Sequence, residues 1–146
     1  MDRDAGIIPS ADARREPDAS AIPRLIFFAD DNDVLLSALT RRFSGRVQRV
    51  RAFTSGEHLL EALARKTPDL IVLDLKLPGL SGLDTLREIR RILPKVAVII
   101  LTAYGTSGDL ESAKTLGVFD VVIKNVGLEQ ELEAAVMRAF LSQDTK

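Results

Sequence analysis

The sequence contains no cysteine and has one histidine, His58, among its 146 residues. Without cysteine the chain forms no disulfide, carries no catalytic thiolate and builds no zinc site from thiolates. A single histidine also excludes metal sites that need several imidazoles. The composition is compatible with a reducing compartment.

A long apolar segment and an excess of charge of one sign are also absent. The longest apolar run, Val96–Leu101, is far too short to span a bilayer, and the polar N-terminus lacks the apolar core of a signal peptide. The 20 lysines and arginines nearly balance the 21 acids, and the formal net charge is -1. This balance gives no electrostatic attraction to nucleic acid or anionic lipid. We therefore expect a cytoplasmic protein with no direct nucleic-acid partner and no membrane partner.

The length is that of one ordinary domain with a single hydrophobic core. Residues 1–22 mix charges with Ala, Ser and Pro and show no useful periodicity, which predicts a flexible N-terminal tail. From Pro23 onward, short apolar runs alternate five times with amphipathic stretches. Residues 23–146 are therefore predicted to form the folded domain.

The apolar runs predict five strands, four of them nearly unbroken Val, Ile, Leu and Phe, as expected for strands covered on both faces. These strands are Arg24–Ala29, Val47–Phe53, Leu70–Leu73, Val96–Leu101 and Val118–Ile123. Apolar residues at helical spacing separate the strands and continue after the last one, from about Leu128 to Leu141. This alternation predicts an α/β fold: a parallel sheet with right-handed crossovers and helices on both faces.

Helix ends are marked by residues with capping preferences. Thr54 with Glu57 matches a capping box for the second helix, and Ser81 is suited to cap the third. Gly117 is suited to close the fourth helix.

Polar residues follow four of the predicted strands at the point where each strand ends. They are Asp30 and Asp31, Asp74, Thr102 and Lys124. Taken singly, an acid after a strand is usually a turn or cap residue, and a lone Thr or Lys is usually structural or solvated. In a parallel sheet, however, all the carboxyl ends of the strands lie on one edge, where ligands bind. The five side chains are therefore expected to converge.

Three carboxylates in one crevice repel one another unless a cation neutralises them. Mg²⁺ suits this role, because it prefers oxygen ligands, retained waters and a phosphate oxygen. With the metal ion and Lys124 drawing charge from a phosphoryl group, a carboxylate can attack phosphorus in line and form an acyl phosphate. Thr102 would then donate a hydrogen bond to a phosphoryl oxygen.

Four segments resemble the response-regulator receiver domains of two-component signalling systems. They are FFADDND at 27–33, LIVLDLKLPGLSGLD at 70–84, VIILTAYG at 98–105 and GVFDVVIK at 117–124. The resemblance covers nearly all of the predicted folded chain. It implies a flavodoxin-like, doubly wound, five-stranded parallel sheet with strand order 2-1-3-4-5.

The resemblance also implies roles for individual residues. Asp74 is expected to be the phosphoacceptor, and Asp30 and Asp31 join it in holding Mg²⁺. The backbone carbonyl of Lys76 completes the protein's share of the metal shell.

Thr102 and Lys124 match the family's switch hydroxyl and its phosphate-pairing lysine. The expected partners are a sensor histidine kinase or a histidine phosphotransfer protein, together with a downstream protein target. A homodimer through the fourth and fifth helices is left open. The chain is interpreted as a stand-alone receiver that accepts a phosphoryl group and signals by docking, rather than as an enzyme.

Two positions depart from the family's usual pattern. Asn125 follows Lys124 where the family usually has proline, often after a cis bond; a cis bond without proline costs about 2.5–4 kcal/mol, so we expect a trans bond and a reshaped loop. Val121 stands where an aromatic residue is usual, so a switch that rotates an aromatic ring cannot run here in the usual way.

Two other functions stay open at this point. FFADDNDVL also resembles the start of haloacid-dehalogenase-like phosphatases, but those enzymes need a second acidic pair at a later strand end, which is missing here. A receiver-like interaction module that is independent of phosphorylation is favoured by Val121 and Asn125. The acidic trio, Thr102 and Lys124 count against it.

Overall fold

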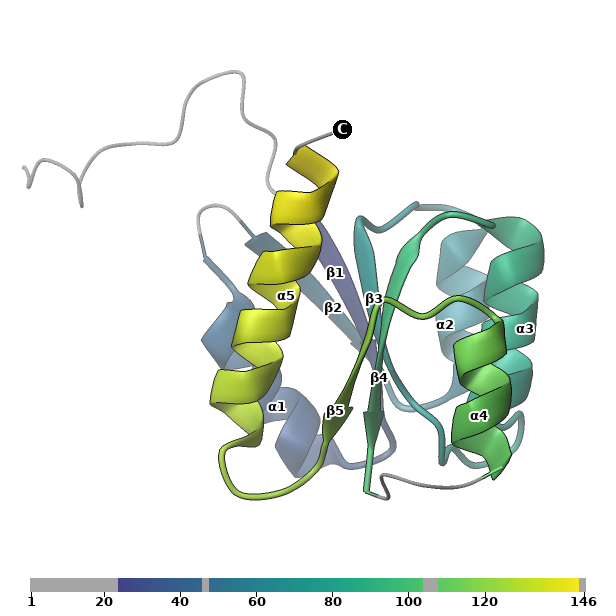
Figure 1. The fold of residues 1–146 in the computed structure, drawn as a ribbon, viewed down its shortest axis with the longest axis horizontal. Helices are drawn as coiled ribbons and strands as arrows, with labels where there is room; N and C mark the ends of the chain where they lie inside the picture. The colour runs from purple at the N-terminus through teal and green to yellow at the C-terminus, as the bar shows by residue number, and fades with distance from the viewer. Residues whose placement is uncertain (1–23, 46–47, 104–107, 145–146) are drawn as a thin grey trace, which may run out of the picture.

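A computed structural model describes residues 24–45, 48–103 and 108–144. The predicted tail at residues 1–22 lies outside these ranges. In chain order (Figure 1), the elements are β1 (Arg24–Ala29), α1 (Asp33–Phe43), β2 (Gln48–Phe53), α2 (Gly56–Leu63), β3 (Leu70–Asp74), α3 (Gly82–Ile92), β4 (Ala97–Thr102), α4 (Gly108–Thr115), β5 (Asp120–Ile123) and α5 (Leu128–Asp144).

The five strands form one parallel sheet with the order β2-β1-β3-β4-β5, as predicted. The predicted strand bounds differ from the observed ones by a residue or two. The largest difference is in β5, where pairing begins at Asp120 opposite Ile99 rather than at Val118. Val47, the predicted start of β2, lies outside the described ranges.

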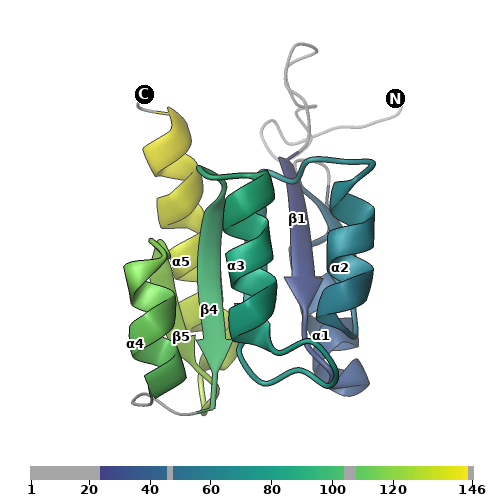
Figure 2. The same ribbon diagram turned by 90° about the vertical axis from the view of Figure 1, so that its right-hand side faces the viewer.

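Helices cover both faces of the sheet. Helices α1 and α5 lie on one side, and α2, α3 and α4 on the other (Figures 1 and 2). Alternate residues of β1 divide between the two layers: Phe27 packs with α2 and α3, whereas Ile26 and Phe28 pack with α1 and α5. Each such fully buried side chain contributes about 1.5–3 kcal/mol. The sheet thus separates two core clusters, one on each face, rather than the single core that the chain length predicted. Together they hold the strands and their carboxyl ends in place.

Strand β2 is at one edge of the sheet, because it pairs with β1 and with no other strand among the described residues. Its pattern is the least apolar of the five, and Arg49, Arg51 and Ala52 are exposed. The guanidinium of Arg51 lies 5.5 Å from the ring centre of Phe53 and 5.8 Å from that of Phe27. The charged group of Arg51 thus lies within cation–π range of an aromatic pair, on a side chain that is exposed to water.

The helix caps confirm two predictions and correct one. Ser81 caps α3 by accepting a hydrogen bond from the Asp84 N–H, and Gly117 follows α4 with φ +81°. The predicted capping box of Thr54 with Glu57 is wrong, because Ser55 is the N-cap of α2 and accepts from the His58 N–H.

Arg90 of α3 joins three segments at the amino-terminal edge of the sheet. Its guanidinium donates to four backbone carbonyls, those of Leu93 (3.2 Å), Val96 (2.8 Å), Leu116 (2.8 Å) and Gly117 (2.9 Å). The carboxyl end of α4 is therefore fastened to α3 and to the start of β4.

Within the described part of the chain, no helix is long and apolar enough to cross a bilayer.

Candidate functional site

The structure brings the predicted acidic residues together at the carboxyl edge of the sheet. Asp30 and Asp31 follow β1, and Asp74 is the last residue of β3. One carboxylate oxygen from each of the three lies within 4.8 Å of the others. Asp30 and Asp74 are buried, whereas Asp31 is exposed. The site therefore has two buried acids at its base and a third toward solvent.

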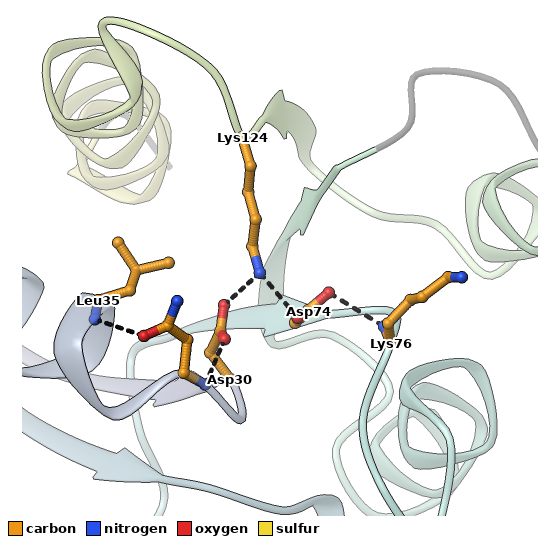
Figure 3. A network of polar contacts seen from close by, with 6 residues as sticks. Asp30, Leu35, Asp74, Lys76 and Lys124 are labelled. Carbon is orange, nitrogen blue, oxygen red and sulfur yellow. Dashed lines mark hydrogen bonds and ion pairs between the residues drawn. The ribbon is translucent and has the colours of Figure 1, made fainter.

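Lys124 lies between the two buried carboxylates (Figure 3). Its Nζ is 2.7 Å from Asp30 Oδ2 and 2.9 Å from Asp74 Oδ2. The Asp30 and Asp74 side chains are 2% and 4% exposed, against 22% for Lys124. A single ammonium group thus partly neutralises two desolvated acids.

Thr102 is the last residue of β4, at the strand end where the sequence predicted it, and it is buried. The Lys124 N–H donates to the Thr102 carbonyl at 2.7 Å. Thr102 pairs with Ile123 in the sheet, so this bond ties the first residue after β5 to the end of β4.

Backbone donors fix the orientation of both buried carboxylates. The Asn32 N–H donates to Asp30 Oδ1 at 2.9 Å, and the Lys76 N–H donates to Asp74 Oδ1 at 3.0 Å. The Asn32 side chain in turn caps α1 by accepting from the Leu35 N–H. The sequence placed Asn32 in a run that could begin this helix but did not single it out as the cap, although its position directly before an amphipathic helix is a capping signal.

Gly82 lies behind the site, and the sequence indicated it only as part of the motif at residues 70–84. A Cβ on Gly82 would lie 2.2 Å from the Asp74 carbonyl oxygen and 2.4 Å from the Leu75 Cα. The Gly82 N–H also donates to the Leu75 carbonyl at 3.0 Å. The first turn of α3 is thus pressed against the backbone of Asp74, and there is no room for a side chain between them.

The surroundings raise the pKa of both Asp74 and Lys124 above their ordinary values. Burial raises the pKa of Asp74 above its ordinary value, and the Asp30 charge adds to this effect; hydrogen bonds from Lys124 and from the Lys76 N–H oppose it. Burial also acts to lower the pKa of Lys124, but the hydrogen bonds and charges of the two acids outweigh it and raise the pKa overall. The cluster of Asp30, Asp31 and Asp74 has three carboxyl groups beside the one ammonium group of Lys124, so negative charge is in excess when all of them are ionised.

The donor set fits a hard divalent cation. Asp30 Oδ2 is buried and accepts no hydrogen bond from the described residues. It forms an ion pair with the ammonium group of Lys124. Three carboxylate oxygens within 4.8 Å, one of them on an exposed residue, leave room for the waters that Mg²⁺ retains. The arrangement is compatible with a magnesium site.

Of the two positions that depart from the family's usual pattern, Asn125 lies in the loop after β5 and Val121 lies within β5. No cis peptide bond occurs among the described residues, so the Lys124–Asn125 bond is trans, as expected. The Leu128 N–H donates to the Asn125 carbonyl at 3.1 Å, and Gly127 adopts φ +87°. Val121 is half-buried and packs against the core on the α2–α4 side.

Comparison with known proteins agrees with this fold and site. The model of the response regulator receiver domain matches residues 26–137, and the chain belongs to this family.

Curated relatives include the DNA-binding transcriptional regulator NtrC of Escherichia coli K12, which is 34% identical over 116 residues, covering 80% of this chain and 24% of the relative. The transcriptional regulatory protein AfsQ1 of Streptomyces coelicolor is 37% identical over 105 residues, covering 72% and 46%. The chain therefore spans about a quarter to a half of the length of these two relatives.

Solved structures show the same architecture. The response regulator DrrB of Thermotoga maritima matches with a TM-score of 0.73 and 28% identity, covering 84% of this chain and 54% of that one. The BeF3-activated DrrB receiver domain matches with a TM-score of 0.72 and 27% identity, covering 82% and 98%. A CheY-like receiver domain protein from Methanospirillum hungatei, at 18% identity and a TM-score of 0.77, covers 86% and 100% and supports the fold alone.

Proposed function

We propose that this receiver domain is a phosphoacceptor of two-component signalling, phosphorylated on Asp74 in a reaction that depends on Mg²⁺. The observation that carries the proposal is the buried Asp74 carboxylate, held within 4.8 Å of two further acids and 2.9 Å from a lysine ammonium. A purely structural acid at a strand end has no need of this surrounding charge.

Each residue has a defined part in the transfer. The carboxylate of Asp74 attacks phosphorus as the bond from phosphorus to the donor's leaving group breaks, so the phosphoryl group passes to an aspartyl oxygen with no net oxidation. Mg²⁺, held by Asp30, Asp31, Asp74 and the Lys76 carbonyl, would neutralise phosphoryl oxygens during the transfer. Lys124 exchanges a carboxylate partner for a phosphoryl oxygen, and the Thr102 hydroxyl donates to another.

The partners follow from this chemistry and from the family. The donor is a phosphohistidine on a sensor histidine kinase or on a histidine phosphotransfer protein, and the signal leaves by docking to a downstream protein target. A homodimer through α4 and α5 would be one such output. The BeF3-activated relative supports the proposal, because beryllofluoride mimics a phosphoryl group on a carboxylate.

The test is incubation with acetyl phosphate and Mg²⁺, followed by intact mass measurement and by assay of released phosphate. The native chain should gain one phosphoryl group, Asp74→Asn should gain none, and Asp31→Ala should lose the dependence on Mg²⁺ and most of the rate. Asp109→Asn, an exposed acid on α4, is the matched control and should behave as the native chain. Full labelling of Asp74→Asn would refute the assignment, and sustained turnover would indicate a phosphatase.

A second candidate is a receiver-like module whose docking is independent of phosphorylation. Val121 and the trans bond before Asn125 favour it, because both remove parts that the family usually uses in switching. No addition of phosphate in the same experiment would support this reading.

A further inference from the structure

The carboxylate of Glu57, near the start of α2, reaches across to the loop that follows Asp74. Glu57 Oε2 accepts a hydrogen bond from the Leu80 N–H at 3.0 Å. This bond, followed by one from its own N–H, lowers the pKa of the Glu57 carboxyl below its ordinary value. The two residues are 23 positions apart, so the contact joins two separate elements.

The tip of this loop leaves room for the carboxylate. Gly79 has φ +68°, and a Cβ there would lie 2.6 Å from Glu57 Oε2. A residue with a side chain would be strained at this φ and would displace the carboxylate as well. The glycine thus allows the Glu57 side chain to lie directly against the loop.

Both ends of the same loop are anchored near Asp74. At its start, the Lys76 N–H donates to Asp74 Oδ1, and at its end Gly82 packs on the Asp74 carbonyl. The loop therefore leaves the phosphoacceptor and returns to it. Its tip, at Gly79 and Leu80, projects toward α2 and is held there by Glu57.

The start of α2 is itself fixed in position against α3. A Cβ on Gly56 would lie 2.0 Å from the Thr85 Oγ1, so the backbone of α2 touches the buried Thr85 side chain directly. Thr85 Oγ1 donates to the Ser81 carbonyl at 2.7 Å. Glu57 therefore extends from a part of α2 that is packed firmly against α3. Its hydrogen bond to the Leu80 N–H restrains the loop.

We propose, on the basis of the phosphoacceptor function above, that Glu57 is a positioning residue for the metal site. By holding the loop between β3 and α3, it keeps the Lys76 carbonyl in place as a metal ligand and restricts the motion of the Asp74 backbone. Glu57 touches neither the metal ion nor the phosphoryl group. Its effect should appear as tighter Mg²⁺ binding, with little effect on the phosphorylation rate when Mg²⁺ saturates.

Three variants of the full chain test this role. Glu57→Ala removes the acceptor, Glu57→Gln keeps an amide oxygen that can accept from the Leu80 N–H, and Glu61→Ala removes an exposed acid one turn further along α2. Mg²⁺ binding is followed from the amide chemical shifts of Asp74 and Lys76 without any phosphodonor. Hydrogen exchange of the Leu80 amide is measured on the same samples.

Loss of one charge-assisted hydrogen bond should raise the Mg²⁺ dissociation constant of Glu57→Ala by about three- to tenfold and speed Leu80 exchange by a similar factor. Glu57→Gln should recover most of both effects, and Glu61→Ala should match the native chain.

Native Mg²⁺ affinity in Glu57→Ala would overturn the proposal, as would equal losses in all three variants. A native chain that binds Mg²⁺ but accepts no phosphoryl group would refute the proposed function and leave the positioning role standing. A native chain that binds no Mg²⁺ would refute both.

Discussion

Substitution of Lys124 by methionine removes the ammonium group between two buried carboxylates and keeps most of the length of the side chain. In the native chain, Nζ lies 2.7 Å from Asp30 and 2.9 Å from Asp74. The variant leaves both acids desolvated and within 4.8 Å of each other without a counterion. We expect this change to destabilise the metal-free fold substantially.

The size of the effect follows from opposing terms. At an effective dielectric constant near 20, each attraction is worth about 6 kcal/mol, and the repulsion between the acids is worth about 3.5 kcal/mol or more. The desolvation cost of Lys124 is recovered in the variant, and Asp74 can take up a proton, which limits the loss. Removing one partner from a buried ion pair generally costs about 3–5 kcal/mol, and we expect about 3 kcal/mol here.

Urea unfolding followed by circular dichroism, in EDTA at neutral pH, measures this loss as a lower midpoint at constant slope. Lys66→Met, which removes an exposed lysine outside the site, is the control and should stay near the native value. Saturating Mg²⁺ should restore much of the lost stability of Lys124→Met, because the proposed metal site is assembled only in the folded state.

The pH dependence has a defined sign. Burial and the charge of Asp30 raise the pKa of Asp74, so protonation neutralises this acid as the pH falls through the raised value. The loss in Lys124→Met should therefore be largest above that pKa and shrink below it. A native-like midpoint in EDTA, or a loss that persists unchanged in acid, would refute the electrostatic reasoning.

Four further predictions follow. Asp74→Asn should stabilise the metal-free fold by about 1 kcal/mol at neutral pH, because a buried acid with a raised pKa lowers stability when it is ionised. A urea midpoint in EDTA below that of the native chain would contradict this. Gly82→Ala should cost about 3 kcal/mol, since its Cβ meets the Asp74 carbonyl oxygen at 2.2 Å, and a native midpoint would disprove that contact. Arg90→Met should lower the free energy of unfolding by about 2–4 kcal/mol, because four backbone carbonyls lose their hydrogen-bond donor. A melting temperature close to the native value would contradict this. The phosphorylated form should persist for minutes to hours, because Lys76 and Tyr104 are poor general bases at neutral pH. Tyr104 lies outside the described residues. An equal or longer lifetime of the phosphorylated form in the Lys76→Asn, Tyr104→Glu double variant would contradict this prediction.

The sheet and the convergence of acids could be predicted from sequence because both depend on local patterns. Strands covered on both faces read as unbroken apolar runs, so the polar residue that ends each run, such as Asp74, marks the edge of the sheet. The order of the strands came from the resemblance rather than from periodicity. The alternation alone does not specify it.

The errors and omissions arise from tertiary contacts. Thr54 and Ser55 both have capping side chains. Ser55 is the cap, and the Glu57 carboxylate accepts a hydrogen bond from the Leu80 N–H instead of closing a capping box with Thr54. The role of Gly82 was hidden because nothing in the motif shows how closely α3 approaches β3. Such contacts join residues that sequence spacing does not connect.

The open edge at β2 has a consequence for how copies of this chain behave at high concentration. An exposed strand presents unpaired amide and carbonyl groups that a second strand can join, which is a common route to aggregation. Here Arg49 and Arg51, two residues apart on that strand, are both exposed, so a second copy pairing along the edge would bring like charges near one another. Repulsion between these charges opposes growth of the sheet from one molecule into the next.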